Sequence, residues 1–203
     1  MVAYDLPSLV SPTLKWERIQ TLDIGGDFGF FNNELNISFD WYQRTTKDML
    51  APGQTMPDVL GAGAPKINAG TLRTRGWELS IDWRHHFNEV NAYANASIGD
   101  FKTVITKWDN DSQLLNENYS GKVYGDIWGF ETDRYFTKDD FNADGSYKEG
   151  IASQKKLEQD GFVYGPGDIK FKDLNNDKEI NGGEGTVKDH GDLKVIGNTT
   201  PRY

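Results

Sequence analysis

Apolar and polar residues alternate in long runs through the first half of the chain, and this pattern constrains the fold more than any other feature. The first run places Leu22, Ile24 and Phe28 at even positions, with Asp23 and Asp27 between them. Successive side chains of a β-strand point to opposite faces of its sheet, so a period of two indicates a strand with one apolar and one polar face. The pattern predicts four such strands, at about residues 16–30, 35–46, 72–84 and 89–104.

The later runs extend the same division into two faces. The expected apolar face carries Leu22, Ile24, Phe28, Leu35, Ile37, Phe39, Trp77, Leu79 and Ile81. The expected polar face carries Asp23, Asp27, Ser38, Asp40, Glu78, Ser80 and Asp82. About ten residues of such alternation are enough for a tilted strand to cross a bilayer, and aromatic residues near the strand ends are typical of the two membrane interfaces.

The connections between the predicted strands alternate between short and long. Short turns are expected at 31–34 and 85–88, a loop rich in Gly and Pro at 47–70, and a very long loop region at 105–195. Outer-membrane barrels have short periplasmic turns and longer extracellular loops, whereas long structureless loops are uncommon in compact soluble domains. We therefore predict an all-β fold for residues 1–104, an antiparallel meander of about four long strands from a transmembrane β-barrel with long irregular extracellular loops.

Composition is compatible with this prediction and excludes several other classes. The 203 residues carry a net charge of -9 and contain no cysteine, so disulfides and thiolate metal sites are excluded and a nucleic-acid partner is not expected. No apolar run is long enough for a membrane-spanning helix. The mean hydropathy of -0.67 suggests a soluble protein, but barrel strands average to polar values because only alternate residues face lipid.

The same alternation also fits a soluble sheet, because one face of an antiparallel sandwich is apolar as well. The alternative to the barrel is therefore a soluble extracellular β module that binds glycan or calcium. It requires the apolar faces of two sheets to pack against each other.

Several motifs, taken together in order and spacing, resemble the late barrel of SusC/RagA-type transporters. They are PTLKWE at 12–17, DFGFFNN at 27–33, DWY at 40–42, TKD at 46–48, NAGTLRTRGWEL at 68–79, GDIKFKDLN at 167–175 and VIGNTTPRY at 195–203. The resemblance covers nearly the whole chain and is weakest over 139–159. It identifies 196–203 as the start of the next strand.

The resemblance implies a TonB-dependent transporter of the cell outer membrane, with a large barrel and an N-terminal plug. Such proteins pair with a SusD-like surface lipoprotein, receive energy from the TonB system and import oligosaccharides or peptides. Four strands cannot close a barrel, since the smallest have eight. We therefore expect the chain to be a fragment, in contact with outer-membrane lipid, that reaches TonB only through a missing N-terminal part.

A candidate metal site lies at residues 173–184, which resemble an EF-hand calcium loop. Such loops arrange oxygen ligands at fixed spacings around Ca²⁺. The expected ligands are Asp173, Asn175, Asp177, Glu179, Asn181 and Glu184. Lys178 departs from the pattern, because that position normally needs glycine for a sharp turn. The alternative is an acidic surface turn in which Asp and Asn bond their own backbone.

No arrangement of residues predicts catalysis, and we expect no enzymatic activity. The adjacent His85 and His86 fit a solvated turn better than a zinc site, which needs converging ligands. Among the aromatic residues of the long loop, Trp108, Tyr124 and Trp128 are the candidates for contact with substrate or lid, because aromatic residues are enriched at interfaces.

Overall fold

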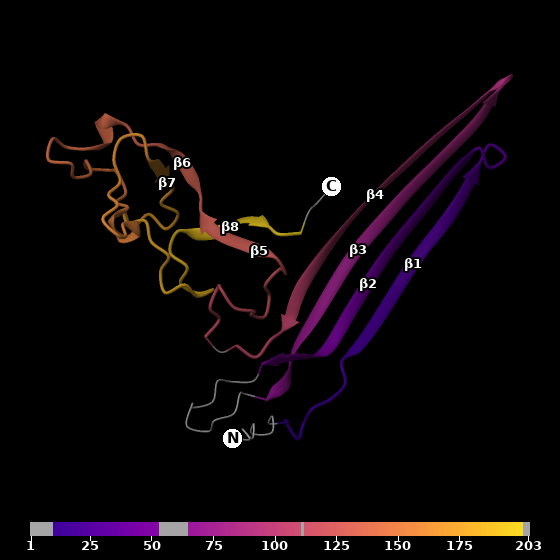
Figure 1. Cartoon of the computed structure of the whole chain (residues 1–203), viewed down its shortest axis with the longest axis horizontal. Helices are drawn as coiled ribbons and strands as arrows, with labels where there is room; N and C mark the ends of the chain where they lie inside the picture. Colours follow the sequence, from indigo (N-terminus) through magenta and orange to yellow (C-terminus); the bar gives the residue numbers. More distant parts are fainter. Residues whose placement is uncertain (1–9, 53–64, 111, 201–203) are drawn as a thin grey trace, which may run out of the picture. The chain divides into compact units, whose positions relative to one another are not determined.

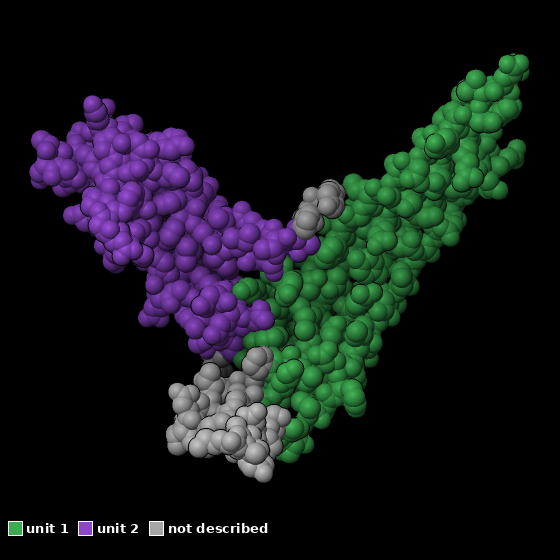
Figure 2. Space-filling view, in the orientation of Figure 1, with its two compact units in different colours: residues 1–109, 120–124, 201–203 green, residues 110–119, 125–200 purple. Residues whose placement is uncertain are grey.

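A computed structural model describes residues 10–52, 65–110 and 112–200 of the chain. The chain divides into two compact units, which are described separately (Figure 2): unit 1 comprises residues 1–109, 120–124 and 201–203, and unit 2 comprises residues 110–119 and 125–200. Within the described residues, no helix has the length and apolar character needed to span a membrane.

Unit 1 is built around one antiparallel sheet of four strands in sequence order (Figure 1). The strands are β1 (Arg18–Phe30), β2 (Leu35–Pro52), β3 (Lys66–Phe87) and β4 (Val90–Lys107). Each strand pairs with its neighbour in the chain along most of its length. The predicted all-β meander is therefore confirmed.

The two short turns lie at the same end of the sheet. The first occupies residues 31–34, as the sequence predicts, with positive φ at Phe31, Asn32 and Asn33. The second begins later than the predicted 85–88: the ladder continues to Phe87, which pairs with Val90. Asn88 makes this turn with a φ of 50°, a conformation that asparagine tolerates well. The two histidines therefore belong to β3.

β2 and β3 extend beyond their predicted limits at the opposite, long-loop end. Most of the described part of the predicted 47–70 loop is strand, and residues 53–64 of that loop lie outside the described residues. A bulge at Asp48, with a φ of 57°, shifts the register there. The Asn68 side-chain amide donates to the Asp48 carbonyl at 2.6 Å and supports the bulge. A bulge interrupts the two-residue alternation, so the sequence pattern ends before the strand does.

Apolar side chains form continuous rows across one face of this sheet. Ile24, Trp41 and Trp77 are successive neighbours in one row, and Phe28 and Ile37 begin another. Ile24 is 60% exposed and Phe28 is 55% exposed. Within unit 1, the described residues form one sheet, so no second sheet covers this face. The sandwich that the soluble alternative requires is not formed in this unit.

Unit 2 contains most of the region predicted as a long loop at 105–195, and it includes short strands within otherwise irregular chain. Two short two-stranded sheets pair β5 (Asp126–Phe130) with β8 (Leu193–Asn198) and β6 (Thr132–Tyr135) with β7 (Ile169–Phe171). Two 3₁₀ turns lie at η2 (Lys138–Asp140) and η3 (Lys155–Leu157). Strands this short show no periodicity in the sequence, which explains why they are missed.

Buried aromatic and aliphatic side chains give unit 2 its own core. The rings of Phe136, Phe141 and Tyr147 lie with centroids 5.2–5.7 Å apart. Ile180 is fully buried, as is the side chain of Gln154. A strand was expected to start at 196–203. Strand β8 begins slightly earlier, at Leu193, ends at Asn198 and pairs with β5, while residues 201–203 lie outside the described residues.

Candidate functional site

The polar face of the four-stranded sheet is the first candidate site. Its central rows, read across the strands, are Asp27–Ser38–Ser80–Ser97, Gly25–Asp40–Glu78–Gly99 and Asp23–Tyr42–Gly76–Phe101. Asp82 extends the group of carboxylates toward the short turns, where Arg84 also lies on this face, and Arg44 lies toward the long-loop end. The alternation alone therefore identifies the polar, acidic character of this face.

An open depression of about 680 Å³ lies on the long-loop half of this face. Gly76 shapes it, because a Cβ atom there would lie 2.5 Å from Cζ of Tyr42 and 2.9 Å from Cβ of Phe101. The glycine thus lets the Tyr42 ring lie across β3. The lining residues are Thr21, Asp23, Asp40, Tyr42, Arg44, Thr74, Glu78, Phe101 and Thr103. Carboxylates accept hydrogen bonds and aromatic rings offer flat apolar surfaces, so the depression suits polar solutes.

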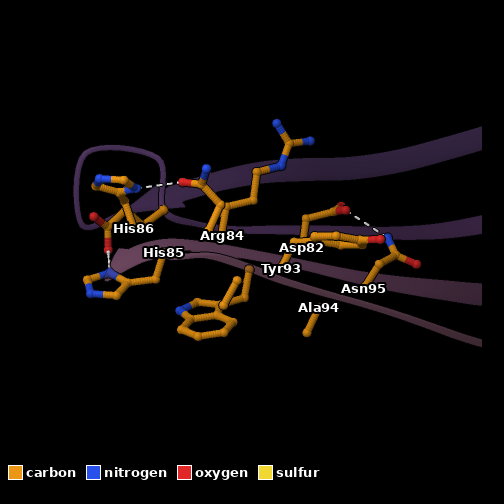
Figure 3. Close-up of a pocket in the computed structure, with 11 residues that line it drawn as sticks. Asp82, Arg84, His85, His86, Tyr93, Ala94 and Asn95 are labelled. Atoms are coloured by element: carbon orange, nitrogen blue, oxygen red, sulfur yellow. Dashed lines mark hydrogen bonds and ion pairs between the residues drawn. The ribbon is translucent and has the colours of Figure 1, made fainter. Parts of the chain in front are cut away.

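A second depression, of about 590 Å³, lies at the short-turn end (Figure 3). His86 and Arg84 project to one side of the ribbon and His85 projects to the other. Nδ1 of His85 lies 2.7 Å from Oε2 of Glu34, and Nδ1 of His86 lies 2.6 Å from Oδ1 of Asn91. The two imidazoles point apart and each has its own partner, so they do not converge as zinc ligands would.

The calcium-like loop of unit 2 brings some of its expected ligands together. Carboxylate oxygens of Asp173, Asp177 and Asp192 lie within 4.8 Å of one another. Asn175 lies beside them, and its side-chain amide donates to Asp177 at 2.9 Å. This hydrogen bond lowers the pKa of the Asp177 carboxyl, and the backbone N–H of Glu179 contributes in the same direction.

The remaining expected ligands point elsewhere. Glu179 forms an ion pair with Lys156 at 2.6 Å. Asn181 accepts the Gly183 N–H at 2.8 Å, and Glu184 is exposed. The cluster of three aspartates is thus smaller than the six-residue set that the spacing predicts.

Asp192 is the member of this cluster that the sequence does not reveal. It is fully buried and accepts the backbone N–H groups of Leu174 at 2.7 Å and Asn181 at 3.0 Å. Asp192, which directly precedes β8, therefore holds an early and a late residue of the loop in place. The loop also makes its sharp turn without glycine, because Lys178 adopts a φ of 66°.

The three candidate aromatic residues have different surroundings. Trp108 is half-buried, and its ring lies so close to Gly70 that a Cβ there would be 2.5 Å from Cε3. Trp128 is half-buried with its ring centroid 5.4 Å from that of His190. Tyr124 is 57% exposed. Trp108 and Tyr124 belong to unit 1 and Trp128 to unit 2, so they are not assigned to one surface.

An ionic cluster in unit 2 is a further feature that sequence spacing does not show. Glu131 accepts from Lys172 at 2.7 Å and from Lys194 at 2.5 Å, linking β7 to β8. These two lysine hydrogen bonds hold the pKa of Glu131 at about 2. Arg134 and Asp140 form a bidentate pair with distances of 2.6 and 2.7 Å.

Comparison with known proteins decides whether this sheet belongs to a membrane barrel or to a soluble module. The model of the family described as TonB dependent receptor-like, beta-barrel matches residues 3–184. The chain belongs to this TonB-dependent receptor family. Its four-stranded sheet is therefore part of a barrel of the cell outer membrane, and the predicted location is confirmed.

Relatives within the TonB-dependent receptor family agree with the SusC/RagA-type resemblance. TonB-dependent receptor P3 of Formosa agariphila is 29% identical over 98% of this chain and 19% of its own length. TonB-dependent receptor SusC of Bacteroides thetaiotaomicron is 33% identical over 37% of this chain and 8% of its own. The chain thus spans about a fifth of the length of the curated relatives that match most of it.

Solved structures confirm the SusC/RagA-type identification. A RagAB peptide transporter is 27% identical, with a TM-score of 0.52, over 62% of this chain and 15% of that chain. A RagAB peptide importer in the open-open state has a TM-score of 0.55 at 24% identity, over 72% of this chain and 17% of that chain, and shows the fold alone.

Proposed function

We propose that unit 1 supplies four strands to the wall of a TonB-dependent transport barrel that imports glycan or peptide nutrients. The observation that carries this proposal is that the sheet of unit 1 has two different faces. One face carries exposed apolar residues, and the other is polar and contains the open depression. The apolar rows contact lipid, and the polar rows line the lumen. The peptide transport of RagAB supports import as the class of activity.

The polar face serves passage rather than catalysis in this proposal. Asp40 and Glu78 lie side by side without a nucleophile in a setting that would suggest acyl or glycosyl transfer. Their oxygens, together with the Tyr42 ring, offer hydrogen bonds and stacking to a solute that moves along the wall. We infer that the chain has no enzymatic activity of its own.

The partners follow from the proposed transport. A SusD-like surface lipoprotein covers the long-loop end, and TonB supplies energy through other parts of the complete protein. The similarity to SusC and to RagAB supports this assignment. We expect the lipoprotein to co-purify with the complete transporter from outer membranes in mild detergent. Its absence under conditions that retain other barrel partners would contradict the lid assignment.

Single cysteines at adjacent positions test the orientation of the sheet. The chain has no native cysteine, so Ser80→Cys and Leu79→Cys can be compared in the complete transporter with any cysteines elsewhere replaced. We expect a water-soluble maleimide to label Ser80→Cys and transported solute to slow that labelling. Leu79→Cys should react only with a lipid-soluble reagent. Equal labelling of both positions by the water-soluble reagent would contradict the proposal.

We also propose that the aspartate cluster of unit 2 binds calcium. The convergence of Asp173, Asp177 and Asp192 within 4.8 Å supports it, because Ca²⁺ prefers several carboxylate and carbonyl oxygens. In the complete transporter, Asp177→Asn should weaken calcium binding in isothermal titration at least tenfold. The matched control is Glu184→Gln, which removes one exposed negative charge outside the cluster. Equal weakening by both variants, or no calcium binding by the wild type, would overturn this proposal.

A further inference from the structure

Five basic side chains share the apolar face of the sheet, and all of them lie at its long-loop end. The alternation and register place on this face Arg18 of β1, Lys47 of β2, Arg73 and Arg75 of β3, and Lys102 of β4. Arg75 lies between Gln43 and Lys102 in one row, and Arg73 lies one row further out. We call this group the outward basic belt. It crosses all four strands, so it is a feature of the sheet rather than of one loop.

The belt begins at the edge of the apolar rows, in the row formed by Leu22, Gln43, Arg75 and Lys102. The next row inward contains Ile24, Trp41 and Trp77, and the apolar rows continue along β3 from Trp77 to Phe87. Ten residues at about 3.3 Å per residue cover about 33 Å of strand, which a tilt of about 40° reduces to about 25 Å of membrane depth. This is the usual height of the apolar band of a barrel. The row that starts the belt therefore lies at the level of the lipid headgroups.

The opposite end of the same face has no such belt. Among the described outward positions from Trp77 to the short turns, there is no lysine or arginine on any of the four strands. That end carries His85, which is engaged by Glu34, and Phe87. If these cations served only to keep the protein soluble, we would expect them at both ends of the apolar face. Because they lie only at the long-loop end, we infer that the two leaflets of the membrane differ in what they present to this face.

Most of the belt has no anionic partner within the described part of the chain. Arg18 forms an ion pair with Asp48 at 2.7 Å. Arg73, Arg75 and Lys102 are exposed and form no ion pair with a described residue; Arg75 donates to the neutral Gln43 side chain at 2.8 Å. One acidic residue, Asp100, shares the face beside Trp77. The belt therefore has an excess of positive charge at headgroup depth.

We propose that the outward basic belt binds phosphate groups of anionic glycolipid in the outer leaflet, with Arg73 and Arg75 as the main contacts. Arginine forms charge-assisted, frequently bidentate hydrogen bonds with phosphate. Thr74 separates the two arginines along β3, and residues two positions apart in a strand point to the same face of the sheet. Arg73 and Arg75 therefore both lie on the apolar face. Lys102, in the row of Arg75, adds a third positive charge. This inference rests on the proposed membrane-spanning orientation of the sheet.

The test compares two pairs of charge removals in the complete transporter in neutral detergent. The first variant carries Arg73→Gln and Arg75→Gln on the outward face. The control carries Arg44→Gln and Arg84→Gln, which remove the same charge from the polar face. The probes are bisphosphorylated lipid A and the same lipid after enzymatic removal of its phosphates. Binding is measured by native mass spectrometry.

We expect the outward variant to bind the phosphorylated lipid on the order of 30-fold more weakly, since each of the two cations removed contributes about 1 kcal/mol near a membrane surface. The control variant should bind as the wild type does, and dephosphorylated lipid should bind weakly to all three proteins. Heat-dependent gel mobility shows whether each variant has a folded barrel. If either double variant fails this check, the single removals Arg75→Gln and Arg44→Gln are compared instead, and Arg75→Gln should bind the phosphorylated lipid on the order of 5-fold more weakly.

Two results would overturn the inference. One is equal affinity of the wild type for phosphorylated and dephosphorylated lipid. The other is the same loss of binding in the outward and control variants. Neither result alters the cysteine-labelling outcome at Ser80 and Leu79, so failure of the lipid site and failure of the barrel orientation are distinguishable.

Discussion

Asp40 on β2 and Glu78 on β3 are direct cross-strand neighbours on the polar face of the sheet. Neither carboxylate forms an ion pair with a described residue. Like charges directly opposite each other in a sheet are destabilising. The chain therefore keeps two acidic groups beside the depression at a cost in stability, which is consistent with a role for this face in solute passage.

Neutralising either member of the pair should stabilise the barrel wall. We expect Asp40→Asn or Glu78→Gln to raise the free energy of unfolding by roughly 0.2–1 kcal/mol. The double variant should gain little beyond either single variant, because one substitution already removes the repulsion. Denaturant unfolding of the complete transporter, followed by tryptophan fluorescence, measures the free energies of unfolding of the wild type, the two single variants and the double variant. Strictly additive effects would show that the two carboxylates do not interact.

Adding a side chain at Gly76 should disrupt the polar face. Gly76→Ala places a methyl group 2.5 Å from the Tyr42 ring and 2.9 Å from Phe101 Cβ, so we expect a loss of about 1–3 kcal/mol through overpacking. Heat-dependent gel mobility of the complete transporter measures the change. Combining it with Tyr42→Ser should recover part of the loss. The control is Gly165→Ala, since no atom lies within 4 Å of the added carbon there.

The buried Gln154 side chain should be essential to unit 2. Its Oε1 accepts the Phe171 N–H at 2.7 Å and its Nε2 donates to the Ile169 carbonyl at 3.1 Å. Gln154→Leu leaves both backbone groups of β7 unsatisfied, at a cost of about 1–3 kcal/mol each. Hydrogen exchange at Phe171 should accelerate accordingly. Gln159→Leu, at an exposed site, should leave this exchange unchanged, and an equal effect of both would refute the argument.

Acid should loosen the link between β7 and β8. Hydrogen bonds from Lys172 and Lys194 lower the pKa of Glu131 from 4.5 to about 2. Because the folded-state pKa is depressed, the stabilisation is fully present above about pH 4.5 and is lost as the pH falls through about 2. Pepsin should therefore cleave unit 2 of the wild type faster as the pH falls from about 4.5 to about 2.

Glu131→Gln provides the control for the acid experiment. This variant lacks the titrating group, so the part of the acid sensitivity that comes from Glu131 should be absent. Asp140 titrates in the same direction, because the Arg134 side chain lowers its pKa, and both proteins keep that contribution. Identical pH profiles for wild type and variant would show that Glu131 does not control the loosening.

The two faces of the sheet could be predicted from the sequence because they depend on local geometry. A strand repeats every two residues, so the positions of Ile24 and Asp23 on opposite faces follow directly from the chain order. The alternating connection lengths, together with the SusC/RagA-type motifs, predicted the barrel class. The long-loop ends of β2 and β3 were missed because register shifts at Asp48 in β2 and beside Gly70 in β3 break the period on which the prediction depends.

Only the tertiary structure decided which distant residues meet. Asp192 joins Asp173 across 19 positions of sequence, and Lys194 reaches Glu131 across 63. No spacing rule links such pairs, because their approach depends on how the short strands of unit 2 pair and pack. The sequence by itself determined the two-faced strands and the class of protein, since periodicity acts within a few residues. The aspartate cluster and the core of unit 2 depended on the three-dimensional fold, since long-range contacts form only when the chain is folded.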